Sequence, residues 1–184
     1  MASRRQSKNV LDSVVVDGVS LGKPRMVRQV VFKHFKDLYF EAWRGKPKLE
    51  GPFTTIGRGG ASNELVAEFT AQEVWAAVTE CDGNKAPGPD GFNLACIQKN
   101  WKVMKDEVMQ FMQEFYANGK LAKGLNSSFI TLVSKKENVV ELVDFRPISL
   151  VNSIYKILAN VLSRRLKKVI PTMINKALTT FIGG

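Results

Sequence analysis

Residues 83–92, with the sequence GNKAPGPDGF, limit the possible folds of this chain more than any other segment. Three glycines and two prolines in ten residues exclude a continuous helix or strand. Because proline fixes one backbone angle and glycine permits angles closed to other residues, we expect a loop of defined shape. Lys85 and Asp90 lie within it. We expect Asp90 to be a turn or helix-capping residue and not a catalytic acid.

Helical patterns lie on both sides of this loop. Before it, apolar residues recur at helical spacing after Pro24, and Thr70 with Glu73 forms a capping-box pattern that begins a helix over residues 71–81. After it, we predict a helix from about residue 93 and a second from about residue 101 to Gly119. The chain has 14 glycines and 7 prolines, and seven of these residues, counted together, lie within residues 41–62. This segment is therefore predicted to be a loop or linker.

Two β hairpins are predicted. In residues 14–21 (VVVDGVSL), an Asp-Gly pair suited to a tight turn separates two apolar runs. Residues 127–136 (SSFITLVSKK) form a β-branched run that ends at Lys135 and Lys136, and residues 145–150 (FRPISL) return after a turn. The fold class is therefore α+β, mostly helical, with a small antiparallel β unit near residues 127–150.

Residues 153–170 are predicted to form an amphipathic helix that ends at Pro171. Its apolar face comprises Ile154, Ile157, Leu158, Val161, Leu162, Leu166 and Val169. Arg165 projects from the middle of this face, where an unpaired charge is costly. We therefore expect Arg165 to snorkel to solvent or to meet a carboxylate or a phosphate.

Positive charge is concentrated at the C-terminal end of the chain. The formal net charge is +10, and residues 145–184 contain seven basic residues and no acid, which leaves 20 basic and 17 acidic residues before them. Such a cluster indicates a surface for a polyanion, or a solvated face that only keeps the protein in solution.

Cysteine and hydropathy patterns exclude several classes of protein. Two cysteines and one histidine provide neither a disulfide framework nor a usual zinc site. No stretch of about 20 apolar residues is present, and no apolar signal core follows the basic N-terminus. We expect a protein of the nucleus or cytoplasm, neither secreted nor bound to a membrane.

Five segments, in this order, resemble the amino-terminal part of the reverse transcriptase of plant LINE-type, non-LTR retrotransposons. They are CDGNKAPGPDGF (81–92), WKVMKDEVMQFMQEFYANGKL (101–121), SSFITLVSKK (127–136), DFRPISLVNSIYKILANVLSRRLKKVIP (144–171) and FIGG (181–184). The resemblance implies an RNA-directed DNA polymerase, a nucleotidyltransferase with right-hand architecture. Residues 1–62 would be the linker region between endonuclease and polymerase, with a short hairpin and one helix. Residues 63–184 would be the fingers, truncated before the palm.

The resemblance also implies sites for the incoming dNTP and for the RNA template with its DNA primer. Triphosphate charge is best matched by Arg and Lys, and Arg146 is expected over the nucleotide with Lys135 or Lys136 on its phosphates or on the template. The alternative is that the two lysines are exposed turn charges. The residues expected to contact the template are Lys85, Lys156, Arg164, Lys167 and Lys168. Further expected partners are the palm region or a second copy of the chain.

The carboxylates that hold Mg²⁺ in this family belong to palm motifs that these residues do not include. No acid follows Asp144, so we expect no catalytic residue and no metal site in this chain, with Mg²⁺ a cofactor of the complete enzyme. We expect the chain to be inactive alone. Three departures from the pattern of the family suggest a decayed or truncated copy. They are Ser134 in place of Pro, Leu178 in place of Gln, and the end of the sequence at FIGG. The alternatives are a non-catalytic basic RNA- or DNA-binding module and a non-functional retrotransposon remnant.

Overall fold

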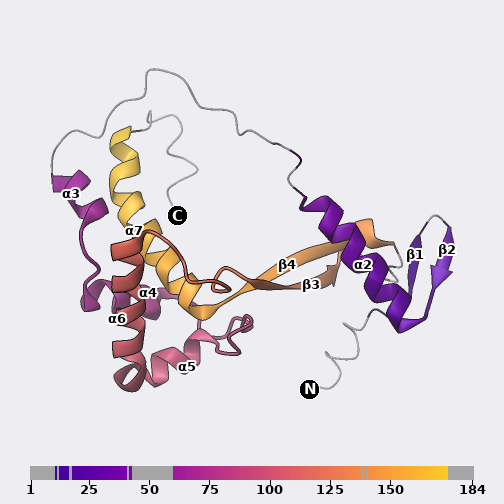
Figure 1. The fold of residues 1–184 in the computed structure, drawn as a ribbon, viewed down its shortest axis with the longest axis horizontal. Coiled ribbons are helices and arrows are strands. Elements are labelled where there is room, and N and C mark those ends of the chain that lie inside the picture. Colours follow the sequence, from indigo (N-terminus) through magenta and orange to yellow (C-terminus); the bar gives the residue numbers. More distant parts are fainter. Residues whose placement is uncertain are drawn as a thin grey trace. The chain divides into compact units, whose positions relative to one another are not determined.

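The computed structural model of the protein describes residues 11, 13–16, 18–40, 42, 60–137, 139 and 141–173 of the 184. The elements, in chain order, are β1 (Val14–Val16), β2 (Val19–Leu21), α2 (Pro24–Leu38), α3 (Gly60–Val66), α4 (Ala71–Glu80), α5 (Leu94–Lys99), α6 (Trp101–Asn118), β3 (Ser128–Ser134), the 3-10 turn η1 (Leu142–Asp144), β4 (Phe145–Val151) and α7 (Ser153–Met173) (Figure 1). The expectations placed on residues 43–59 and on Leu178 and FIGG lie outside the described residues.

The elements form a mostly helical α+β structure with two small antiparallel sheets of two strands each. This confirms the predicted fold class at that level. The chain divides into two compact units, and each is made of two stretches of sequence. Unit 1 comprises Met1–Glu50 and Ile130–Ser149, and unit 2 comprises Gly51–Phe129 and Leu150–Gly184. Strands β3 and β4 each contribute residues to both units.

Unit 1 is built around the N-terminal hairpin and α2. Strands β1 and β2 pair antiparallel, with Val14 opposite Leu21 and Val16 opposite Val19, as the Asp-Gly pattern predicted. Helix α2 begins at Pro24, where the missing N–H of proline costs no helical hydrogen bond. Val14, Val27 and Leu142 are buried against one another, so the β1–β2 hairpin, α2 and η1 share one small apolar core.

Unit 2 contains the main core, to which α4, α5, α6 and α7 all contribute. Its buried residues are Phe69, Val74, Ala77, Val78, Leu94, Ile97, Val108, Met112, Ile157, Leu158 and Val161. Local signals fix the helix ends. Thr70 Oγ1 accepts a hydrogen bond from the Glu73 backbone N–H at the start of α4. Gly119 ends α6 with a φ of 62°, a left-handed conformation that favours glycine.

Three sequence predictions about the helices need correction. Helix α3 begins at Gly60, inside the segment predicted to be loop through residue 62. Helix α7 continues through Pro171 to Met173, because a proline in the last turn removes only one backbone hydrogen bond of the helix. On α7, Leu166 was predicted on the apolar face but is 48% exposed, whereas Arg165 is 6% exposed, as its predicted place on that face implies.

The structure also bears on membrane association. No helix among the described residues is long and apolar enough to cross a membrane.

Candidate nucleic-acid interface

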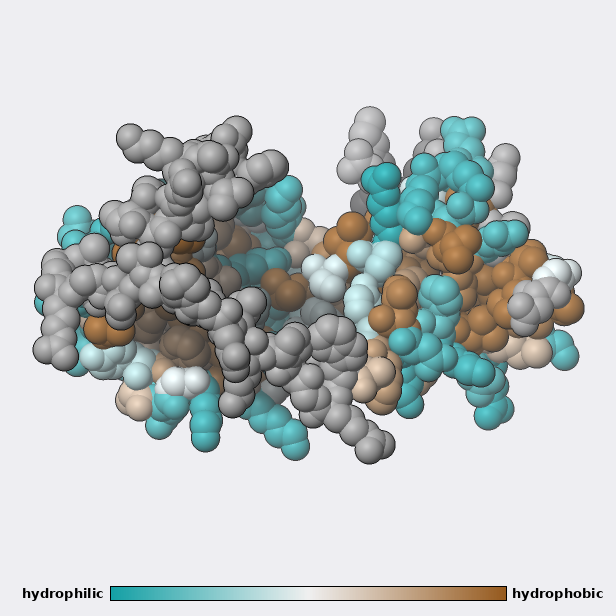
Figure 2. Space-filling view, turned by 90° about the horizontal axis from the view of Figure 1, so that it is seen from above, coloured by the Kyte–Doolittle hydropathy of each residue, from teal (hydrophilic) through white to brown (hydrophobic). Residues whose placement is uncertain are grey.

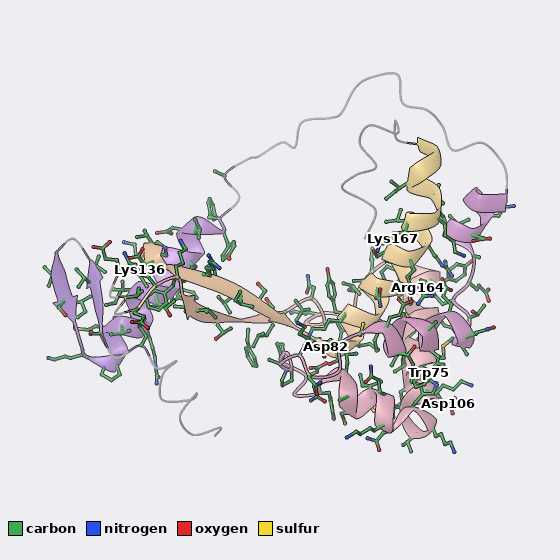
Figure 3. All side chains as sticks on the ribbon, turned by 180° about the vertical axis from the view of Figure 1, so that it is seen from behind. Trp75, Asp82, Asp106, Lys136, Arg164 and Lys167 are labelled. Carbon is green, nitrogen blue, oxygen red and sulfur yellow. The ribbon has the colours of Figure 1, made fainter. Side chains whose placement is uncertain are left out.

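The end of the hairpin formed by β3 and β4 gathers three of the predicted site residues within unit 1. The Lys135 backbone N–H donates to the Asp144 carbonyl at 2.9 Å, which pairs the end of β3 with the start of β4. The Lys136 ammonium lies 2.7 Å from an Asp144 carboxylate oxygen, and the Lys135 ammonium donates to the Val143 carbonyl at 2.6 Å. Arg146 follows two residues after Asp144 and is exposed. Lys135, Lys136 and Arg146 therefore lie at the same end of the hairpin, where Figure 3 shows Lys136.

These three cations differ in how much of their charge the protein already engages. The hydrogen bond to Asp144, with the charge of the same carboxylate, raises the pKa of Lys136 above its ordinary value. Asp144 therefore competes with any anion that approaches Lys136. Within the described part of the chain, the guanidinium of Arg146 has no hydrogen-bond or ion-pair partner. Its planar set of donors remains open to a ligand.

The loop over residues 83–92 is fastened to the start of α7. One Asp90 carboxylate oxygen accepts from the Phe92 backbone N–H at 3.3 Å, and the other accepts from the Ser153 backbone N–H at 2.6 Å. Asn152 completes the junction, because its amide oxygen accepts from the Asp90 backbone N–H at 2.9 Å. The Ser153 hydroxyl also donates to the Phe92 carbonyl. These contacts confirm that Asp90 is a turn and helix-capping residue, and the helix that it caps is α7.

Gly88 brings the loop backbone directly against the end of β4. A Cβ at this position would lie 2.3 Å from the Val151 carbonyl oxygen and 2.6 Å from the Asn152 nitrogen, too close for any side chain. The Lys156 ammonium donates to the Ala86 carbonyl at 3.2 Å and adds a further contact between α7 and the loop. Lys85 is exposed on this loop and pairs with Asp82 at 3.6 Å. The loop thus presents Lys85 from a fixed backbone.

The predicted template-binding cations on α7 are largely paired within unit 2. Arg164 lies 2.7 Å from Glu80 and Lys168 lies 2.9 Å from Glu64. Lys167 is exposed and has no polar partner in the part of the chain that the structure describes. Figure 3 shows Arg164 and Lys167 on the same helix. The positive charge of α7 is therefore less available to a polyanion than its sequence indicates, apart from Lys167.

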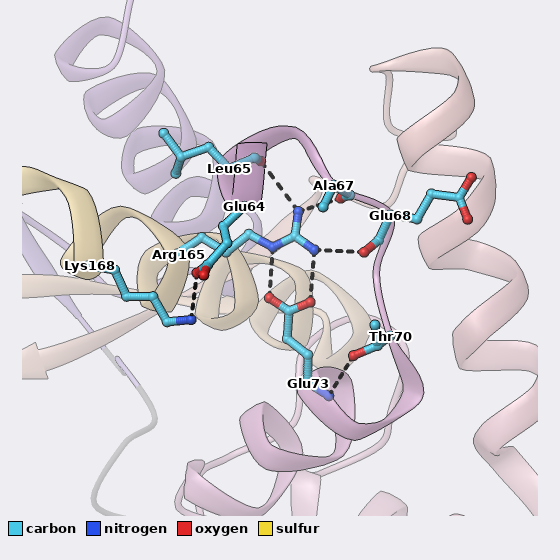
Figure 4. A network of polar contacts seen from close by, with 8 residues as sticks. All are labelled: Glu64, Leu65, Ala67, Glu68, Thr70, Glu73, Arg165 and Lys168. Carbon is cyan, nitrogen blue, oxygen red and sulfur yellow. Dashed lines mark hydrogen bonds and ion pairs between the residues drawn. The ribbon is translucent and has the colours of Figure 1, made fainter. Parts of the chain in front are cut away.

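Arg165 is the centre of a polar network between α7 and the segment before α4 (Figure 4). Its guanidinium forms a two-pronged contact with the Glu73 carboxylate, at 2.7 and 2.8 Å, and lies 4.5 Å from the centre of the Phe69 ring. The same group donates to the backbone carbonyls of Leu65, Ala67 and Glu68 at 3.3, 2.6 and 3.0 Å. Of the three environments expected for Arg165, which were solvent, a carboxylate or a phosphate, the structure shows the carboxylate. Glu73 thus has two roles: its backbone N–H donates a hydrogen bond to the Thr70 hydroxyl, and its carboxylate forms the ion pair with Arg165.

The Arg165 network shifts the ionisation of both charged partners. The hydrogen bond from Arg165 holds the pKa of Glu73 below its ordinary value of 4.5, although partial burial opposes this. The hydrogen bond from Glu73 in turn raises the pKa of Arg165. A cavity of about 420 Å³ adjoins the network and is lined by three acids and three cations: Glu64, Glu68, Glu73, Arg164, Arg165 and Lys168. These charges balance, so the cavity has no net attraction for phosphate.

Sequence reasoning missed Asn152 and Gly88, which hold the loop in place. An Asn directly before a helical apolar pattern is a usual capping signal, and it was available at residue 152. In the structure, the Asn152 side chain binds the loop backbone, 62 residues away in sequence. No cluster of three or more His, Cys, Asp or Glu residues that could hold a metal ion occurs among the described residues.

Taken together, the described elements define a small α+β protein with a basic hairpin end and a loop locked to a basic helix. No family model matches the sequence. The chain is similar to the transposon TX1 uncharacterized 149 kDa protein of Xenopus laevis, with 25% identity over 169 residues. The alignment covers 86% of this chain and 12% of that protein, so the chain spans about an eighth of its relative's length. The protein is therefore a distant homologue of a transposon protein.

Proposed function

We propose that this chain is part of the fingers of a LINE-type reverse transcriptase, which holds an incoming dNTP and the template strand. The sequence segments that resemble that family support the proposal, and so does the distant homology to a transposon protein. The observation that carries it is the gathering of Lys135, Lys136 and Arg146 at one end of the β3–β4 hairpin, where Arg146 has no polar partner among the described residues.

A triphosphate suits this hairpin end for chemical reasons. Arg146 offers a planar fork for two phosphate oxygens, and its face can stack on a base. Lys135 and Lys136 offer point charges beside it. Asp144 neutralises part of this charge when the site is empty, and a triphosphate would displace it from Lys136. The chain's own residues thus bind and orient the nucleotide. Mg²⁺, held by palm carboxylates in the complete enzyme, would supply the chemistry of transfer.

Nucleotide binding tests this site directly. The binding of a fluorescent dNTP to the 184-residue chain should weaken about tenfold in Arg146→Ala, since a hydrogen bond to a charged group contributes about 1.5 kcal/mol at an exposed position. Asp144→Asn should tighten binding, because Lys136 loses its internal competitor. Lys102→Ala, which removes an exposed cation of α6, is the matched control and should leave affinity unchanged. Equal affinities for Arg146→Ala and the control would contradict the assignment.

The template strand is proposed to follow unit 2 along the locked loop and α7. Lys85 is held on the loop, and Lys156, Arg164, Lys167 and Lys168 lie on α7. Because Arg164 and Lys168 already pair with acids, Lys167 should contribute most of the phosphate contact. Lys167→Gln should lower the salt dependence of RNA binding more than Lys168→Gln does. A larger effect of Lys168→Gln would contradict this ranking.

A polypeptide of these 184 residues is proposed to bind its substrates without polymerising them. No acidic residue follows Asp144, so the carboxylates of the palm motifs must come from elsewhere. Primer extension on an RNA template with Mg²⁺ should give no incorporation. Incorporation that is lost on removal of Mg²⁺ would refute this part of the proposal. Oligonucleotide binding with no dNTP binding would instead favour a non-catalytic nucleic-acid-binding module.

A further inference from the structure

Helix α2 in unit 1 carries a second basic and aromatic surface, which the proposed function does not use. Arg28, Phe32, Phe35, Lys36 and Tyr39 follow each other at helical spacing and therefore share one side of α2. All five line a groove of about 460 Å³, closed on its other side by Ile130 and Leu132 of β3. Phe35 forms the floor and stacks on Tyr39, with ring centres 6.3 Å apart. We name this surface the α2 groove.

The rings at the rim of the α2 groove are open to solvent. Phe32 is 69% exposed and Tyr39 is 56% exposed, although both are aromatic side chains that gain by leaving water. Arg28 and Lys36 are exposed beside them. Figure 2 shows hydrophobic and hydrophilic side chains next to each other over the part of the chain that contains α2. An exposed surface that combines aromatic rings with cations indicates a partner that is itself both flat and charged.

The cations of residues 23–36 also differ from those of α7 in their pairing within the described part of the chain. Lys23, Arg25, Arg28, Lys33 and Lys36 carry five positive charges, against one acid, Asp37, on the same segment. None of the five side chains has a hydrogen-bond or ion-pair partner among the residues that the structure describes. On α7, by contrast, Arg164, Arg165 and Lys168 are each paired with a glutamate. Two of the five cations of residues 23–36, Arg28 and Lys36, line the α2 groove.

We propose that the α2 groove binds a single-stranded nucleic acid, with unpaired bases stacked on Phe32 and Tyr39 and the backbone phosphates on Arg28 and Lys36. Every base has an aromatic face, so stacking on exposed rings needs strands whose bases are not paired. The two rings are seven residues apart, Phe32 on α2 and Tyr39 at its C-cap, which is about 10 Å at the rise of a helix, with Lys36 between them. A short stretch of about two bases spans this distance. The binding does not depend on the polymerase assignment, because it uses none of the residues placed at the nucleotide site.

The chemistry of the groove favours a single-stranded nucleic acid over an apolar protein partner. A purely apolar helix would bury Phe32 and Tyr39 but would leave the charges of Arg28 and Lys36 without partners at the edge of the contact. A single strand satisfies both, because each nucleotide brings one base and one phosphate. A polyanion that carries flat apolar groups therefore complements both the rings and the cations of the groove.

Fluorescence anisotropy with a labelled twelve-nucleotide oligouridine and the full chain tests the proposal. Phe32→Leu and Tyr39→Leu keep an apolar side chain but remove the stacking face, so each should weaken binding about fivefold or more at an unchanged salt slope. Lys36→Gln should lower the slope of log K against log salt by about 0.7. Tyr116→Leu, which removes an exposed ring of α6, and Lys33→Gln, which removes a cation that lines a different cavity, are matched controls. Neither should reproduce these effects.

A twelve-base-pair RNA duplex separates stacking from a general effect of the substitutions. The double variant Phe32→Leu/Tyr39→Leu should bind the duplex as the unaltered chain does, because paired bases are not available to the rings. Equal weakening for both nucleic acids, or unchanged binding of the oligouridine, would overturn the proposal. So would sedimentation that shows the double variant abolishing a dimer while RNA affinity stays constant, since the groove would then join two copies. Loss of dNTP binding in Arg146→Ala bears only on the nucleotide site and leaves this test independent.

Discussion

Replacing Arg165 with methionine should destabilise unit 2 more than any other single change to its charged residues. Methionine keeps a long apolar stem, so the change removes the guanidinium and its contacts without leaving a large cavity. The lost contacts are the two-pronged pair with Glu73, the hydrogen bonds to three backbone carbonyls and the contact with the Phe69 ring. The segment before α4 is tied to α7 largely through these contacts (Figure 4).

The expected loss follows from the burial of the pair. The Arg165 side chain is 7% exposed and that of Glu73 is 24% exposed, so removal of the cation leaves a carboxylate mostly shielded from water. Breaking a buried pair from one side costs about 3–5 kcal/mol. Because Glu73 retains some solvent, we expect the lower end, about 3 kcal/mol of unfolding free energy. At an m-value near 2 kcal/mol/M this lowers the urea midpoint by about 1.5 M.

Tryptophan fluorescence during urea unfolding measures this loss in unit 2. Trp75 and Trp101 stack with ring centres 5.0 Å apart beside the core of this unit, and Trp43→Phe as a background removes the third tryptophan. Lys168→Met is the matched control, because its pair with Glu64 is exposed on both sides and should contribute no more than about 0.5 kcal/mol. If Arg165→Met and Lys168→Met lower the midpoint equally, the burial argument is wrong.

Three further predictions concern the pH dependence of stability, the loop over residues 83–92 and the capping of α7 by Asp90. The folded state lowers the pKa of Glu73 below 4.5, so the ionised carboxylate stabilises the fold above that pH. The unfolding free energy should therefore fall as the pH drops below about 4.5, and it should fall less steeply in Arg165→Met. Urea titrations at each pH measure both slopes. Gly88→Ala should cost about 1–3 kcal/mol, since its Cβ meets the backbone after β4, whereas Gly22→Ala, with open space around it, should cost almost nothing in thermal unfolding. Asp90→Ala should remove about 1 kcal/mol and speed hydrogen exchange at the first amide of α7; unchanged exchange there would contradict the capping role.

Much of the fold was predictable because local patterns specify local structure. Thr70 and Gly119 mark helix ends through contacts or angles within a few residues of themselves. The β-branched run that ends at Lys135 likewise formed a strand of the expected hairpin, since strand preference is also read from neighbouring residues. Patterns of this kind depend on the period of 3.6 or 2 residues, which sequence displays directly.

The contacts that shape the candidate interface were harder to predict. Arg165 was expected either to snorkel to solvent or to meet an anion, and its partner Glu73 lies 92 residues away, so no local pattern could identify Glu73 among the acids. The same holds for Asn152 and Asp90, which are 62 residues apart. The neutralisation of Arg164 and Lys168 by acids also followed only from tertiary packing, so net charge overstated the free charge of α7. Long-range pairing leaves no periodic signal in the sequence.

The division of the chain has a consequence for how its parts can be produced separately. Residues 130–149 belong to unit 1 and interrupt the sequence of unit 2. This segment begins within β3 and ends within β4, and the two strands pair with each other. No single truncation point therefore yields either unit intact. An internal deletion that joins Phe129 to Leu150 through a two-residue Asn-Gly turn would instead keep unit 2 in one continuous polypeptide. Unit 2 should therefore be produced by deleting residues 130–149 from within the chain, and not by truncation at the ends alone.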